Sequence, residues 1–87
     1  MDNLFITCPT AYDDSHYEAV DLLLGQLTSR DIVFTEDDYR KLIADSHSYL
    51  FLLHCDDSVV GMLTVGVYLS PTGSKAWIED VVVDNAY

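Results

Sequence analysis

The sequence predicts an α+β domain in which a mainly antiparallel sheet carries two packed helices. Two observations predict this class. Two amphipathic segments, each opened by a helix-start signal, follow a short apolar run near the N-terminus. Three strand-like segments joined by short turns then complete the chain, and strands joined in this way form an antiparallel meander. The predicted order is strand, helix, helix, strand, strand, strand, within a single domain spanning residues 1–87.

The N-terminal third of the chain predicts one strand and one helix. Leu4 to Cys8 is an apolar run rich in β-forming residues, and Pro9 ends it because proline cannot donate a hydrogen bond to a neighbouring strand. Ser15 is predicted to cap the first helix, with Glu18 three residues later completing a capping box. Apolar residues then recur at helical spacing, and the helix is expected to end near Thr28.

A second helix is predicted to begin at Thr35. Asp38 takes the place of the glutamate or glutamine that completes a capping box, and two further acids suit the positive end of the helix dipole. A narrower apolar stripe follows, and the helix is expected to run to about Asp45 or Ser46.

Two strands are predicted after the second helix. Ser48 to Cys55 is a near-continuous apolar run, which is typical of a central strand buried on both faces. Val59 to Leu69 is a longer strand that needs a bend, for which Gly61 and Gly66 are the candidates. The turn between Ser70 and Ser74 is rich in residues that interrupt regular structure.

The closing strand is predicted over the last thirteen residues, Lys75 to Tyr87, where aromatic and β-branched residues dominate. Glu79 and Asp80 are adjacent, so in a regular strand their side chains point to opposite faces. An acid in a mostly apolar row is costly unless it is paired, hydrated or used. Alternation predicts one face with Ala76, Ile78, Asp80 and Val82, and another with Trp77, Glu79, Val81 and Val83.

Charge excludes several classes of partner. Fifteen acids against four basic residues give a net charge of −11, which repels nucleic acid and anionic membrane but attracts a cationic amine. Cys8 and Cys55 lack the spacing of a zinc site, so no metal is expected. Neither a signal peptide nor a transmembrane segment is recognisable, which favours the cytoplasm and reduced thiols.

The element order and the closing motif IEDVVVDNAY together resemble the N-terminal half of an acetyltransferase domain of the GNAT superfamily. Val60 and Gly61, which follow an acidic turn, resemble the start of the family's third strand. The resemblance implies a partial GNAT fold and an acetyl-CoA-dependent N-acyltransferase that transfers an acetyl group to a small-molecule or peptide amine. The matching residues of the motif are Ile78, Glu79, Asp80, Val81, Val83, Asp84 and Tyr87.

The resemblance also implies roles for residues of the closing strand. The backbone of Val81, Val82 and Val83 would bind the pantetheine arm of acetyl-CoA. Acyl transfer needs a group that accepts the proton of the amine, and Glu79 is the candidate catalytic base. Asp80, the second catalytic candidate, would orient a neighbouring element or bind the acceptor amine. A β-bulge, which is common in this strand of the family, would shift the alternation and exchange their roles.

Structural alternatives stand beside these roles. The three valines also suit a plain core strand, and Asp80 also suits a structural acid held by backbone N–H groups. The three histidines form no ligand pattern; His16 is expected in solvent and His54 at a strand end. Tyr17 and the loop from Asp31 to Phe34 could edge an acceptor pocket, although they also suit packing and a solvated helix start.

The most specific motif of the family, R/Q-x-x-G-x-G/A, would begin directly after Tyr87, where the sequence ends. Either the natural chain continues or the gene is truncated, and these 87 residues are expected to be inactive alone because they hold no phosphate-binding loop. The alternative function is a non-catalytic association module. It would form a homodimer through the exposed edge of the closing strand or through an uncovered sheet face.

Overall fold

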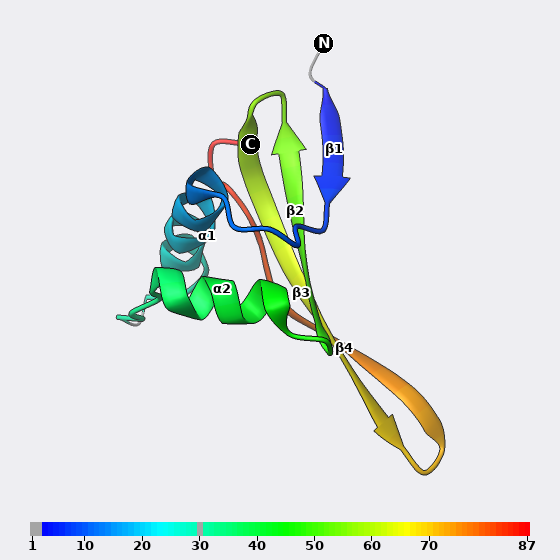
Figure 1. The fold of residues 1–87 in the computed structure, drawn as a ribbon. Coiled ribbons are helices and arrows are strands. Elements are labelled where there is room, and N and C mark those ends of the chain that lie inside the picture. The colour runs from blue at the N-terminus through cyan, green and yellow to red at the C-terminus, as the bar shows by residue number, and fades with distance from the viewer. Residues whose placement is uncertain (1–2, 30) are drawn as a thin grey trace.

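The computed structural model describes residues 3–29 and 31–87 and contains a four-stranded sheet with two helices (Figure 1). The predicted α+β class and element order are confirmed. The elements in chain order are β1 (Leu4–Thr7), α1 (Asp14–Leu27), α2 (Glu36–Ala44), β2 (Ser48–Cys55), β3 (Ser58–Ser70) and β4 (Gly73–Val83).

The strands follow the spatial order β1-β2-β3-β4, and every neighbouring pair is antiparallel. This is the meander that short turns between consecutive strands require. Both helices lie on one face of the sheet (Figure 1), where α1 packs on β3 and β4 and α2 packs on β2. β4 is therefore an edge strand, and the second face of the sheet is uncovered by helices.

The core lies between the helices and one face of the sheet. Its buried side chains come from both layers, and burying each large apolar side chain stabilises the fold by roughly 1.5–3 kcal/mol. The members are Val20 and Leu23 of α1, Tyr39 of α2, Leu50 and Leu52 of β2, and Met62 of β3.

The first helix begins earlier than predicted. Asp13, and not Ser15, is the N-cap, because the Asp13 carboxylate accepts hydrogen bonds from the backbone N–H groups of Ser15 (2.8 Å) and His16 (3.4 Å). The Ser15 hydroxyl itself donates to Asp13. A carboxylate is a stronger acceptor than a hydroxyl and favours the positive end of the helix dipole. Thr28 follows the last turn as the C-cap, as predicted.

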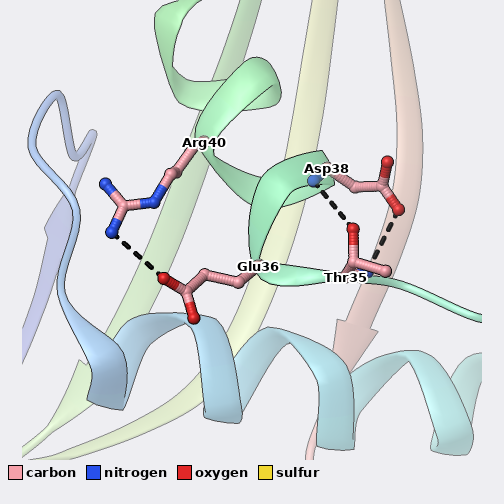
Figure 2. Close-up of polar contacts among 4 residues, drawn as sticks. All are labelled: Thr35, Glu36, Asp38 and Arg40. Carbon is pink, nitrogen blue, oxygen red and sulfur yellow. Dashed lines mark hydrogen bonds and ion pairs between the residues drawn. The ribbon is translucent and has the colours of Figure 1, made fainter.

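The second helix begins as predicted, with a capping box between Thr35 and Asp38 (Figure 2). The Thr35 hydroxyl accepts from the Asp38 N–H at 3.1 Å, and the Asp38 carboxylate accepts from the Thr35 N–H at 3.0 Å. The bond from the Thr35 N–H lowers the pKa of Asp38 below its ordinary value, because it favours the ionised carboxyl. One turn on, Arg40 pairs with Glu36 at 3.1 Å (Figure 2).

β2 keeps its predicted bounds, but the prediction that both its faces are buried is wrong. Leu50, Leu52 and His54 are buried against the helices, whereas Tyr49 on the other face is 44% exposed and Phe51 is half-buried. The apolar content of a strand reports its preference for burial and cannot specify what covers each face.

The two long strands of the meander form a hairpin whose tip projects beyond the rest of the sheet (Figure 1). Near the turn between β2 and β3, the pairing of these two strands shifts by one residue. Val60 of β3 is the extra residue, and it lies between the cross-strand pairs Leu53–Gly61 and His54–Val59. The register shift thus lies next to Gly61, one of the two positions predicted for a bend. Gly66 pairs with Trp77 in a ladder without a shift.

Candidate functional site

A second register shift lies inside β4, at the acidic pair. Met62 pairs with Val82 and Thr64 pairs with Glu79, so Asp80 and Val81 together face the single residue Leu63. This is a β-bulge. Asp80 has a φ angle of 53°, in the left-handed region that L-residues other than asparagine and aspartate rarely occupy.

The bulge makes the predicted two-face pattern of the closing strand wrong. Through their β3 partners, Glu79 and Val82 now lie on the helix-covered face, since Thr64 pairs with buried Leu50 and Met62 belongs to the core. Ile78 and Val83 lie on the opposite face, beside Val65 and Gly61. An extra residue reverses the alternation for every position after it.

A cleft opens beside the bulge on the helix side of the sheet. It has a volume of about 480 Å³ and lies between the end of α1, the loop before α2 and β4. Asp80 is the one charged residue among those that line it, and the other walls are mostly apolar. The lining residues are Leu24, Leu27, Thr28, Ile32, Phe34, Asp80 and Val81.

The loop that forms one wall of this cleft is held by Tyr17. Its hydroxyl donates a hydrogen bond to the Phe34 carbonyl oxygen at 2.9 Å, and its ring lies 6.0 Å from that of Phe34. Burial, with nearby acids, raises the pKa of Tyr17, so the hydroxyl remains a donor at neutral pH. The sequence singled out both Tyr17 and this loop, but the bond that joins them needs the packed helices.

The two adjacent acids of β4 lie at different places relative to the cleft, although both are exposed. Both Glu79 and Asp80 are exposed, and no basic side chain among the described residues forms an ion pair with either. Asp80 lines the cleft, whereas Glu79 does not. The bulge that was expected as a possibility in this strand is present, and the roles of the two acids stay a prediction.

The three valines continue the strand past the bulge. Val82 packs against the core, while Val81 and Val83 are 56% and 51% exposed. β3 pairs with one edge of this segment, and no described strand pairs with the other edge. Two hydrogen bonds fix its end: the N–H of Asp84 donates to Val60 O at 2.7 Å, and the N–H of Asn85 donates to Gln26 Oε1 at 2.8 Å.

A histidine cluster lies away from the cleft, between β1, β2 and α1. His54 is buried, its Nε2 lies 2.7 Å from Thr7 Oγ1, and its ring stacks on Phe5 at 4.5 Å. His16 is half-buried against His54 at 5.7 Å, and not in open solvent as predicted. Burial, and secondarily His16, lowers the pKa of His54. These contacts join β1 to the sheet and to α1.

Within residues 3–29 and 31–87, no three His, Cys, Asp or Glu side chains gather closely enough to hold a metal ion. Over the same residues, no helix is long and apolar enough to cross a membrane.

Comparison with known proteins finds the same fold in two solved structures. No family model matches the sequence, and no curated protein matches it significantly. Two solved structures match. Glucosamine-6-phosphate N-acetyltransferase from Arabidopsis thaliana has a TM-score of 0.75 at 18% identity, over 97% of this chain and 62% of its own. An aminoglycoside acetyltransferase from an uncultured soil metagenomic sample, solved with trehalose, has a TM-score of 0.66 at 17% identity, over 98% and 57%.

The match extends over nearly the whole described sheet and both helices, while the identity is too low to carry residue roles across. The chain spans about three fifths of the length of each of these two enzymes. The fold expected from the element order together with the motif IEDVVVDNAY thus agrees with the measured similarity of fold. The chain has the GNAT-like fold of these acetyltransferases, in partial form.

Proposed function

We propose that this chain forms the acceptor side of an acetyl-CoA-dependent N-acyltransferase, with the amine acceptor in the cleft beside Asp80. The observation that carries the proposal is the bulge in β4. It places Asp80 among the residues that line an otherwise mostly apolar cleft, at the point where the outer edge of the strand has no described strand partner. The fold of two acetyltransferases supports the same reaction class.

The described residues fit one part of acetyl-CoA. The outer edge of residues 81–83 has no strand partner among the described residues, so its backbone groups are available to the amides of an extended pantetheine arm. They fit the phosphates poorly, because no Gly-rich loop or basic cluster is described near this edge and the chain carries a net charge of −11. Acetyl-CoA, when bound, supplies the acyl group.

The acids have distinct proposed roles. Asp80 attracts the ammonium form of the acceptor, and its carboxylate accepts the proton that the amine must lose before it can attack. Glu79, on the same side of the sheet but outside the cleft lining, is the second catalytic candidate and receives the proton from Asp80 or from solvent. The apolar walls favour an acceptor whose amine is attached to an apolar group.

Binding can be tested apart from turnover. Acetyl-pantetheine and acetyl-CoA are titrated separately into ¹⁵N-labelled protein, and amide shifts of residues 81–83 are followed. We expect acetyl-pantetheine to bind at least as well as acetyl-CoA, since its smaller charge meets less repulsion. Shifts confined to other residues would contradict the assignment of this edge.

Acceptor binding is tested with a panel of primary amines. Asp80→Asn should weaken binding of a cationic amine by roughly tenfold, because it removes the one carboxylate of the cleft. Asp57→Asn is the matched control, because it removes the same charge from an exposed turn between β2 and β3. Equal losses in the two variants would assign the effect to net charge and refute the site.

The location of the protein belongs to the same proposal. Cys8, which is exposed, and Cys55, which is buried, form no disulfide in the described chain. Cysteines outside disulfides suit a reducing compartment, so we propose a cytoplasmic protein. Labelling of Cys8 in intact cells with a membrane-permeant thiol reagent, but not with an impermeant one, would support this location.

A further inference from the structure

Two histidines, His16 of α1 and His54 of β2, lie in contact away from the cleft and are here named the histidine pair. His54 is buried, at 8% exposure, and its ring stacks on that of Phe5 with the centroids 4.5 Å apart. Its Nε2 lies 2.7 Å from the hydroxyl oxygen of Thr7. The ring of His16 meets that of His54 edge-on, with the centroids 5.7 Å apart. The imidazole of His54 thus contacts both β1 and α1.

β1 has few attachments besides the histidine pair. It is four residues long and lies at an edge of the sheet, with β2 as its strand partner (Figure 1). None of its residues belongs to the core cluster between the helices and the sheet. Two hydrogen bonds between Asn3 and Asp56, at 3.0 and 2.8 Å, fix its beginning, whereas Phe5 and Thr7 contact His54. A short edge strand without core side chains opens at a lower free energy than the rest of a sheet.

The histidine pair fits the neutral form of both imidazoles. A charged imidazole donates from both of its ring nitrogens. Nδ1 of His16 is buried and has no hydrogen-bond partner in the described chain, so in the charged form it would be an unpaired buried donor. Burial first, and His16 second, lower the pKa of His54, because both disfavour a charge on its ring.

The groups around the histidine pair do not offset this cost. β1 faces His54 with an aromatic ring and a hydroxyl, and β3 pairs Val59 with it, so neither strand supplies a carboxylate. In the turn after β2, Asp56 already accepts a backbone N–H at 3.0 Å. From α1, the carboxylate of Asp13 attracts a charge on His16, but it also caps the helix, and the positive end of the helix dipole opposes that charge.

Separation of β1 from β2 would remove these penalties for His54, because water would then reach its imidazole. A proton binds the hydrated imidazole more tightly than the buried one, so proton uptake shifts the equilibrium toward the separated strand. Since the pKa of His54 is lowered in the closed form, that form is fully favoured above about pH 6.5 and loses stability as the pH falls from there. Over this interval the opening constant rises by up to about tenfold per pH unit.

We propose that the histidine pair is an acid-sensitive switch: proton uptake releases β1 from the sheet while both helices and the other three strands stay folded. The strand left at this edge is then β2, whose eight residues are mostly apolar. An apolar edge of this length pairs readily with another strand. Acid thus converts a closed edge into one that is open to strand addition. The switch lies outside the cleft, so it is independent of the proposed function.

Amide hydrogen exchange, followed by NMR on the ¹⁵N-labelled 87-residue chain, tests this inference from about pH 7.5 to about pH 5. Each rate is divided by the intrinsic rate at the same pH, which leaves the opening equilibrium. We expect the protection of residues 4–7 to fall by up to about tenfold per pH unit below about pH 6.5, while that of residues 61–65 in β3 stays constant. Equal loss of protection in both strands would indicate unfolding of the whole chain and overturn the proposal.

Three substitutions assign the response to the histidine pair. His54→Gln keeps a polar side chain but has no titrating group, so the protection of residues 4–7 should no longer depend on pH. His47→Gln is the matched control: it makes the same change at an exposed histidine in the turn before β2, and its response should equal that of the parent. His16→Gln should leave a smaller response, because it removes the imidazole that helps to lower the pKa of His54, and it serves as the test if His54→Gln does not fold. A response that persists in His54→Gln, or that His16→Gln leaves unchanged, would refute the switch.

Discussion

The left-handed backbone of Asp80 can be tested by stability alone. This conformation costs an L-residue about 1–2 kcal/mol, and aspartate tolerates it better than most. A β-branched side chain tolerates it worst, so Asp80→Val should lower the free energy of unfolding by about 1–2 kcal/mol. Asp80→Gly should raise it by about 0.5 kcal/mol, because relief of the φ angle exceeds the entropy that glycine loses on folding.

These changes are large enough to measure by thermal unfolding. For a domain of this size, about 1 kcal/mol shifts the melting temperature by roughly 4–8 °C, so Asp80→Val should melt about 5–10 °C lower than the parent. Glu79→Val is the control, since it removes the same charge one residue earlier, in regular strand pairing with Thr64. Equal melting temperatures for Glu79→Val and Asp80→Val would refute the bulge geometry.

Three other predictions test the capping, the core and the pH response. Thr35→Ala should cost about 1 kcal/mol by removing the hydroxyl that accepts from Asp38, whereas Thr35→Ser should cost little; urea denaturation measures both. Leu52→Ala should cost about 2–5 kcal/mol, because the side chain is fully buried, while Leu22→Ala at a 63% exposed position should cost far less in the same assay. Because burial lowers the pKa of His54 below its ordinary 6.5, stability should be fully present above about pH 6.5 and fall as the pH drops below it. His54→Gln should flatten this decline in urea titrations, and an unchanged slope would exclude His54 as its source.

Local sequence signals predicted the elements well where the deciding contacts are themselves local. The capping box of α2 lies within four consecutive residues, so its partners are close in any helical conformation. β2 was predicted with its observed bounds because polar turns flank a continuous apolar run. The first helix shows the limit of such signals: Asp13 and Ser15 are both good caps, and the sequence did not rank them.

The residues of the candidate site were predicted from a sequence motif, but the face of the sheet on which each lies was decided by the pairing of β4 with β3. Glu79, Asp80 and the three valines were found from a motif, but their faces depend on the register with β3. The bulge arises because two residues of β4 oppose Leu63, a fact that no property of β4 alone contains. The cleft likewise needs three segments far apart in sequence, the end of α1, the loop that includes Phe34, and β4.

By itself, then, the sequence determined the class of fold, the order of its elements and the acidic charge of the chain. Hydrophobic period, caps and turns are short-range properties, and they are sufficient for those conclusions. Only the tertiary structure decided that Asp80 and not Glu79 lines the cleft, and that helices cover β2 on one face alone. Each of these depends on which strand lies beside which, and long-range pairing sets that arrangement.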